Sequence, residues 1–306
     1  MRTAIITHPN CRKHKMIADH PECPARLDAI SDRLLASGLD IALEHKSAPK
    51  AEPEHYALVH DQAMIAEVMN KVPEQGLAEL DGDTWLCPDS FKAIERAVGA
   101  GLLAVDEILA GELEAAFCAV RPPGHHANQS TSSGFCVFNN VAIATAYAKS
   151  KGVERIAILD FDVHHGNGTQ DIFNQDHSVL FCSLFQYPFY PNTAIENHQS
   201  LINSPLPAGA GGDDLKALFL QQWLPKLEAF APQLIFISAG FDGHLEDEMG
   251  GLQFVEQDYH WFTEQVVAFA KQHGCLGIIS YLEGGYDFSS LGRSAVMHLK
   301  ALVEDS

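Results

Sequence analysis

Short apolar runs rich in β-branched residues alternate with longer amphipathic stretches from one end of the chain to the other. The runs have the length and composition of buried strands, and they cover residues Ala4–Thr7, Ala116–Val120, Arg155–Leu159, Val179–Leu184, Leu234–Ser238 and Leu276–Tyr281. This alternation is typical of a mainly parallel sheet covered by helices on both faces. The sequence therefore predicts a three-layer α/β fold.

The stretches between the runs have the apolar spacing of helices, and several begin with Pro or Asp. They cover residues Pro24–Ala36, Pro88–Leu109, Val137–Lys149, Asp213–Phe230, Glu256–Gln272 and Ser289–Val303. No linker rich in Pro, Gly, Ser or charged residues interrupts the alternation, so we expect residues 1–306 to form a single catalytic domain.

The chain has a net charge of −20, from 40 acidic and 20 basic residues. Phosphate binding needs clustered Lys and Arg, so a nucleic acid partner is not expected and a cationic substrate is easier to accept. Seven cysteines without CxxC spacing favour reduced thiols in a cytoplasm. The N-terminal apolar stretch is too short for a signal peptide, and no segment has the ~18 apolar residues of a membrane helix. We expect a soluble cytoplasmic protein with no membrane partner.

Metal-binding side chains follow two of the predicted strands. Asp162 and His164 come after one strand, and Asp242 comes after another. In open α/β sheets, sites gather beyond the carboxyl ends of strands, and a buried carboxylate needs a partner. Two carboxylates and one imidazole predict a Zn²⁺ site with an open position for water, although Fe²⁺ or Co²⁺ would also fit.

Acid/base and donor side chains follow two further strands. His125 and His126 form a pair suited to proton transfer near neutral pH. Tyr286 follows two glycines that permit unusual backbone angles, which predicts a hydroxyl donor placed over the metal. Gly134 and Phe135 lie a few residues after the histidines and predict an apolar wall beside the site.

In these motifs, and in His20-Pro-Glu-Cys-Pro-Ala-Arg26, the chain resembles the zinc-dependent histone deacetylase superfamily. That superfamily also includes bacterial histone deacetylase-like amidohydrolases, acetylpolyamine amidohydrolases and acetoin-utilisation proteins. The likeness covers nearly the whole chain, and Asn167 in Gly166-Asn-Gly-Thr-Gln170 looks like the class II branch. It implies an arginase-like α/β fold with a central, mostly parallel sheet of about eight strands.

The resemblance also implies a role for each matching residue. It implies zinc ligands Asp162, His164 and Asp242; a histidine pair His125 and His126 backed by Asp160 and Asn167; a transition-state donor Tyr286; a substrate tunnel lined by Phe135, Tyr190 and Met249, with Asp83 at its rim; and a potassium site at Asp160, Ser183 and the Leu184 carbonyl. Branches that act on polyamines carry a loop insertion and an acidic tunnel residue. This chain has little room for the insertion, and Met249 is neutral, although Glu246 and Glu248 lie close by.

The predicted reaction is hydrolysis of an N-acetyl amine, with acetyl-lysine favoured, to acetate and a free amine. A zinc-activated water would attack the carbonyl, Tyr286 would stabilise the oxyanion, and the histidines would move the protons. Because Asp160 is charged and Asn167 is neutral, the pKa values of the two histidines should diverge, which favours His126 as the base. A single histidine that serves as both base and acid is the alternative.

Three other functions remain open at this point. The first is deacetylation of acetylpolyamines or other small amides. The second is a two-metal ureohydrolase, which is less favoured because His244 stands where a second metal would need Asp. The third is a metal-binding protein without catalysis, which Tyr286 and the intact histidine pair argue against. The sequence leaves the oligomeric state undetermined.

Overall fold

The computed structural model describes residues 1–193 and 195–304 and is built around an eight-stranded sheet. The strand order is β2-β1-β5-β10-β9-β6-β7-β8, and neighbouring strands are parallel throughout. The strands are β1 (Thr3–Thr7), β2 (Glu44–Ser47), β5 (Ala115–Cys118), β6 (Ile156–Asp160), β7 (Val179–Gln186), β8 (Leu201–Leu206), β9 (Leu234–Ala239) and β10 (Ile278–Leu282). The predicted α/β class is confirmed.

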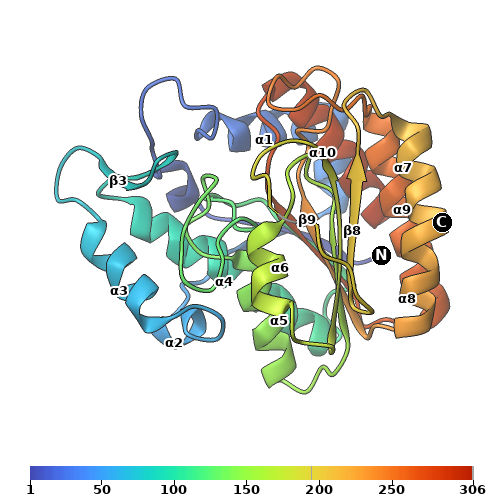
Figure 1. The fold of residues 1–306 in the computed structure, drawn as a ribbon. Helices are drawn as coiled ribbons and strands as arrows, with labels where there is room; N and C mark the ends of the chain where they lie inside the picture. Colours follow the sequence, from blue (N-terminus) through green and yellow to red (C-terminus); the bar gives the residue numbers. More distant parts are fainter. Residues whose placement is uncertain (194, 305–306) are drawn as a thin grey trace.

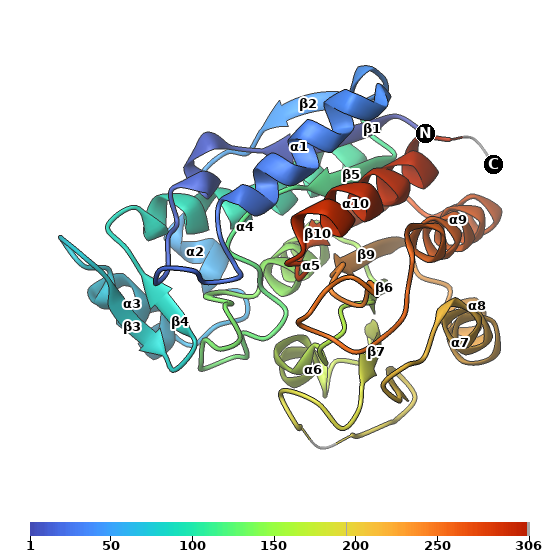
Figure 2. The same ribbon diagram turned by 90° about the horizontal axis from the view of Figure 1, so that it is seen from above.

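Helices cover both faces of this sheet (Figures 1 and 2). One face carries α1 (Ala25–Ser37), α9 (Glu256–His273) and α10 (Phe288–Val303), with α7 (Gly212–Leu218) and α8 (Leu224–Phe230) beside α9. The other face carries α4 (Ser90–Leu109), α5 (Asn140–Ser150) and α6 (Asn167–Phe173). The antiparallel pair β3 (Ala78–Asp81) and β4 (Thr84–Leu86) stands beside the main body with α2 (Pro53–Tyr56) and α3 (Gln62–Lys71), at the left of Figure 1.

Local signals in the sequence set several helix ends. The Asp287 side chain accepts the Ser290 N–H at the start of α10, and the Asn139 side chain does the same for Ala142 at the start of α5. Gly274 ends α9 in the left-handed conformation that glycine adopts without strain. The cap at Asp287 matters for the site, because it fixes where α10 begins directly after Tyr286.

The predicted strands and helices are all present, with their ends shifted by a few residues, and one prediction needs correction. The stretch 213–230 was expected to be one regular helix, but a π-helical turn at Phe219–Trp223 interrupts it. Pro225 follows this turn, and its ring and missing N–H disfavour a regular α-helical turn there. The edge strands β2 and β8 and the short elements β3, β4, α2, α3 and α6 were not predicted.

The four central strands β5, β10, β9 and β6 are neighbours in the sheet, and each is followed by one of the predicted motifs. The strands run in parallel, so their carboxyl ends lie at one edge, where Asp160 is in register with Ser238 and Leu282 with Ala239. All seven cysteines are free thiols. None of the helices in residues 1–193 and 195–304 is long and apolar enough to cross a membrane.

Candidate active site

Three buried ligand side chains converge at the carboxyl ends of β6 and β9. The ligand atoms of Asp162, His164 and Asp242 all lie within 4.8 Å of one another. His164 Nδ1 is 3.1 Å from Asp162 Oδ1 and 3.2 Å from Asp242 Oδ2. Backbone donors hold the carboxylates in place, since the Gly284 N–H donates to Asp162 at 2.8 Å and the Val163 N–H donates to Asp242 at 3.0 Å.

The chemistry of this cluster fits a divalent cation. Asp242 Oδ2 is buried and, although His164 Nδ1 lies 3.2 Å away, it makes no well-aligned hydrogen bond among the residues that the structure describes. Burial, reinforced by the neighbouring Asp162 carboxylate, raises the pKa of Asp242 to about 7. A bound cation would use the free oxygen and relieve this repulsion. A Cβ at Gly284 would lie 2.0 Å from Asp242 Oδ2, so the glycine leaves room for this arrangement.

The two predicted histidines lie side by side, with different partners. His125 Nδ1 is 3.0 Å from Asp160 Oδ2, and His126 Nδ1 is 2.7 Å from Asn167 Oδ1. Burial by itself would lower the pKa of His125, but the Asp160 and Asp162 carboxylates raise it well above its usual range. Burial, followed by the charges of His125 and His164, lowers the pKa of His126 well below its usual range. The opposite pKa shifts favour a charged His125 and a neutral His126.

Glu283 holds the backbone at His125 in place, a role that was not predicted. Its Oε2 accepts the backbone N–H groups of Gly124 at 2.7 Å and His125 at 3.1 Å. Burial raises the pKa of Glu283 to about 7. The position of Glu283 directly after β10 was the one sequence feature that could have indicated this role. Its partners Gly124 and His125 lie 159 and 158 positions away in the chain.

Tyr286 follows β10 on a loop whose backbone is held by Arg26. The guanidinium donates to Gly285 O at 2.6 Å and to Glu283 O at 2.5 Å, and it lies 4.9 Å from the centroid of the Tyr286 ring. Gly285 has a φ of 113°, which favours glycine strongly. Burial, reinforced by Asp242, raises the pKa of Tyr286 well above its usual range, so the hydroxyl stays protonated and can donate.

A cavity of about 290 Å³ reaches this centre from the surface. It is lined by Asp83, His126, Gly134, Phe135, His164, Phe189, Tyr190, Met249 and Tyr286. The five residues predicted to contact substrate are all in this lining. Phe189 was missed, although it stacks on His164 with ring centroids 5.3 Å apart. The aromatic run Tyr187-Pro-Phe-Tyr190 was the available signal.

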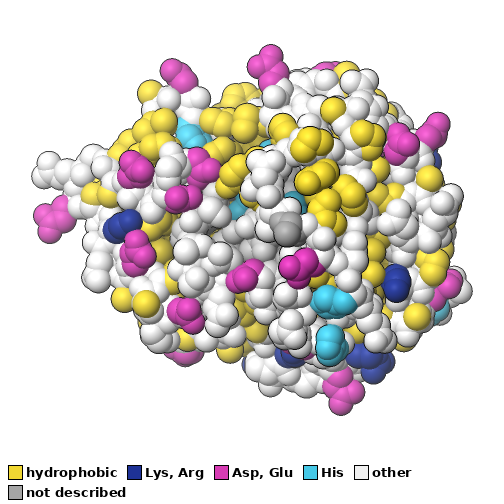
Figure 3. Space-filling view, in the orientation of Figure 1, with side chains coloured by type: hydrophobic (Ala, Val, Ile, Leu, Met, Phe, Trp, Pro, Cys, Tyr) yellow, Lys and Arg dark blue, Asp and Glu magenta, His cyan; other side chains and the backbone are white. Residues whose placement is uncertain are grey.

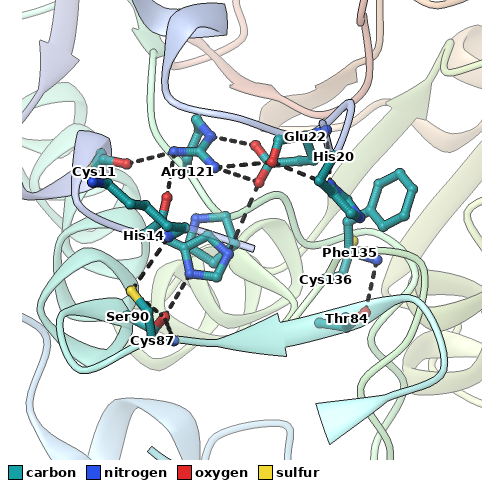
Figure 4. Close-up of polar contacts among 12 residues, drawn as sticks. Cys11, His14, His20, Glu22, Thr84, Cys87, Ser90, Arg121, Phe135 and Cys136 are labelled. Atoms are coloured by element: carbon teal, nitrogen blue, oxygen red, sulfur yellow. Dashed lines mark hydrogen bonds and ion pairs between the residues drawn. The ribbon is translucent and has the colours of Figure 1, made fainter. Parts of the chain in front are cut away.

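A hydrogen bond joins Phe135, in the wall of the cavity, to Thr84 (Figure 4). The Thr84 hydroxyl accepts the Phe135 N–H at 3.0 Å and donates to Asp83 Oδ1 at 2.7 Å. The His20 ring packs edge-on against Phe135, with centroids 4.6 Å apart. Phe135 has a φ of 67°, which is unusual for a side chain of this size, so these contacts hold a strained residue in place.

A buried ion cluster lies behind the wall (Figure 4). Glu22 pairs with Arg121, which precedes the histidine motif, and with Arg26, which holds the tyrosine loop. Burial would raise the pKa of Glu22, but the two guanidinium groups lower it to about 2. Sequence reasoning used residues 20–26 only as a point of resemblance and did not foresee this cluster.

Two other predictions concern ions. Asp160 and Ser183 are partners in the β6–β7 register, with Leu184 next along β7, so the residues of the predicted potassium site are neighbours. His244 is buried and turned away from the ligand cluster, with Nδ1 accepting the Glu246 N–H and Nε2 3.6 Å from Glu256. The described residues contain one cluster of three metal-ligating side chains, which favours a mononuclear centre.

A buried Asp-His-Asp cluster, a histidine pair and a tyrosine hydroxyl at the end of an aromatic cavity define a metal-dependent hydrolase on an α/β fold. The model of the histone deacetylase domain matches residues 20–302, and the chain therefore belongs to the histone deacetylase family. It is an enzyme of the deacetylase class, which acts on amide bonds.

Proteins that are similar to this chain carry deacetylase names. An archaeal probable deacetylase from Archaeoglobus fulgidus is 34% identical over 97% of this chain and 86% of its own length. The human polyamine deacetylase HDAC10 is 36% identical over 100% of this chain, which spans only 48% of that protein. The crystal structure of the HDA15 HD domain matches with a TM-score of 0.91 and 31% identity, covering 98% of this chain and 88% of that one.

Proposed function

We propose that this protein is a zinc-dependent deacetylase whose preferred substrate is an acetylated lysine side chain. The observation that carries the proposal is the cavity, whose walls are formed by the uncharged Phe135, Tyr190 and Met249 and whose inner end reaches His164 and Tyr286. A neutral alkyl chain with a terminal acetyl group suits such walls. Asp83 is the carboxylate among the residues that line this cavity, and the uncharged Met249 offers no partner to an ammonium group within the chain.

The residues of the site divide the chemistry among them. When bound, zinc held by Asp162, His164 and Asp242 would polarise the amide carbonyl and lower the pKa of a water toward ~7. His126, kept neutral, accepts the proton of the attacking water. Tyr286 donates to the oxygen on which negative charge develops, and His125 adds a positive charge nearby. A protonated imidazole then delivers a proton to the leaving amine.

The first test is turnover on a panel of substrates. Purified enzyme loaded with zinc should hydrolyse acetyl-lysine peptides with a higher kcat/KM than N-acetylputrescine or N8-acetylspermidine. Removal of the metal by a chelator should abolish turnover, and added zinc should restore it. A preference for the polyamines would overturn the proposed substrate, and activity that survives complete metal removal would overturn the mechanism.

Deacetylation of polyamines is the second candidate. It is favoured by the similarity to a polyamine deacetylase and by the net charge of −20. Acidic side chains are spread over the face seen in Figure 3, and basic ones are sparse there. The same panel separates this candidate from the first.

Three further points complete the proposal. A structural K⁺ would lie at Asp160, Ser183 and the Leu184 carbonyl. The chain would act as one catalytic domain over residues 1–306. It would work in the cytoplasm on acetylated substrates, without nucleic acid or membrane as a partner. Catalytic rates compared in potassium and in sodium buffers would test the K⁺ site, since an enzyme that needs K⁺ loses rate in sodium alone.

A further inference from the structure

Asp247 lies outside the predicted site but makes three hydrogen bonds beside it. Its side chain is 4% exposed, on the loop between β9 and α9. Asp247 Oδ2 accepts the backbone N–H of Tyr286 at 2.6 Å and that of Asp287 at 3.0 Å. Asp247 Oδ1 accepts the N–H of Met249 at 2.9 Å. One carboxylate therefore joins the loop of the tyrosine to the cavity wall at Met249.

The bonding pattern needs a carboxylate. Both oxygens of Asp247 accept from backbone donors, and a carboxylate is the small side chain that offers acceptors on both sides. Asparagine has one oxygen and one NH₂ group. Its oxygen could keep the bonds to Tyr286 and Asp287, but its NH₂ group would then face the Met249 N–H, another donor.

The loop that carries Asp247 is also held by contacts outside the tyrosine loop. Its Glu246 pairs with Arg293 of α10 at 2.7 Å, and the Gly251 N–H donates to Gln186 Oε1 at 2.6 Å. A Cβ on Gly250 would lie 2.7 Å from Asp242 O and 2.8 Å from a Val163 methyl, so the backbone is closely packed there. These contacts therefore hold the backbone around Asp247 in place.

The tyrosine loop, in contrast, contains two glycines and needs external restraints. Arg26 holds its carbonyl groups at Glu283 and Gly285. The amide side of the same turn, at Tyr286 and Asp287, is held by Asp247. Because Gly285 gives the turn unusual freedom, loss of either restraint should let the tyrosine hydroxyl leave the position where the oxyanion forms.

We propose that Asp247 is a positioning residue that sets the Tyr286 hydroxyl for transition-state stabilisation and, through its other oxygen, the Met249 wall. This inference rests on the proposed deacetylase function. Each carboxylate oxygen then has a separate effect. Loss of the hydrogen bonds to Oδ2 should lower kcat, and loss of the hydrogen bond to Oδ1 should raise KM.

The test compares Asp247→Ala with Asp247→Asn, each alone and combined with Tyr286→Phe. Asp247→Ala should lower kcat at least about tenfold, part of the ~10²–10³ that one oxyanion donor supplies. In the Tyr286→Phe background the same change should alter kcat by less than about twofold, because a residue that acts through Tyr286 has nothing left to position. Asp247→Asn should keep kcat within a few-fold of the parent and raise KM.

Asp258→Ala is the matched control. Asp258 is also buried, at 6% exposure, and accepts a backbone N–H from Val255 at the start of α9. Its loss should lower thermal stability and leave kcat unchanged. Zinc content is measured for every variant, because Asp247 is close enough to Asp242 to influence its charge.

Hydrogen exchange followed by mass spectrometry gives a readout that does not need activity. Asp247→Ala should speed exchange of the Tyr286 and Asp287 amides, whereas Asp247→Asn should speed exchange at Met249 alone. An inactive parent enzyme would contradict the proposed function, and the exchange pattern would still decide the positioning role. If Asp247→Ala does not fold, the positioning role is tested by Asp247→Asn alone, through its KM and the exchange rate of its Met249 amide.

Three results would overturn the inference. The first is a kcat of Asp247→Ala near that of the parent. The second is an equal loss in the Tyr286→Phe background, which would show that Asp247 acts through the metal or the fold. The third is an Asn variant whose kcat falls while KM and exchange at Met249 stay unchanged.

Discussion

The unequal partners of the two histidines lead to a prediction on pH dependence. Burial and the charge of His125 lower the pKa of His126, and its Nδ1 lies 2.7 Å from the neutral Asn167 amide. Replacing Asn167 with Asp puts a negative charge at that hydrogen bond. The charge stabilises the imidazolium form, so the pKa of His126 should rise.

The size of the pKa shift of His126 follows from its direct contact with position 167. A carboxylate in contact with an ionisable group shifts its pKa by about 1–3 units, and each unit corresponds to about 1.4 kcal/mol. Asn167 is only half-buried, so water will screen part of the new charge and a shift near the lower end, about 1 unit, is expected. A base must be deprotonated to work. The variant should therefore lose activity at a higher pH than the parent as the pH falls.

The assay is the pH profile of kcat/KM for both enzymes with zinc content confirmed. Asn174→Asp is a matched control, since Asn174 Oδ1 lies 3.1 Å from His198 Nε2, and the same change in charge occurs outside the cavity lining. Its profile should match that of the parent. The zinc-activated water titrates in the same region, so the acidic limb is compared between variants. An acidic limb that stays in place in Asn167→Asp, with zinc bound, would refute the role of His126 as base.

Four other outcomes follow from the site. Tyr286→Phe should lower kcat by about 10² with zinc retained, and a loss of only a few-fold would contradict its role as donor. Elemental analysis should find about one transition metal per chain, whereas two would favour the ureohydrolase alternative. With a net charge of −20, kcat/KM for basic acetyl-lysine peptides should fall as salt rises, and equal rates on acidic and basic peptides at low salt would argue against steering. Thr84→Val should raise KM about tenfold by leaving the Phe135 N–H unpaired, while Thr84→Ser should not; equal KM values in both variants would exclude this role.

Much of the site could be predicted because its key side chains follow buried strands within a few residues. Asp162 and His164 come directly after β6, and Asp242 comes shortly after β9. A parallel sheet brings such strand ends together by its geometry, whatever the loops do. Apolar periodicity therefore sufficed to predict the α/β class and to place the candidate ligands, the histidine pair and Tyr286 at one edge.

The missed edge strand β2 shows one limit of reading the apolar pattern. Strand β2 has the sequence Glu-His-Lys-Ser and lies at the edge of the sheet, where side chains stay exposed and carry no apolar pattern. The helical stretch after β8 was predicted as regular because periodicity does not distinguish an α-helix from a π-helical turn.

Only the tertiary structure showed how the site is held in place. Asp247 contacts Tyr286 across 39 positions of sequence, Glu283 contacts His125 across 158, and Arg121 contacts Glu22 across 99. A side chain of this kind looks like any other Asp, Glu or Arg in the sequence, because its partner is a backbone amide or a charge on a distant segment. The sequence by itself predicted which candidate groups meet at one edge of the sheet, through their places after buried strands. The packing of distant loops decided which buried charges fix those groups in position, since hydrogen-bond partners are set by distance in space rather than by spacing along the chain.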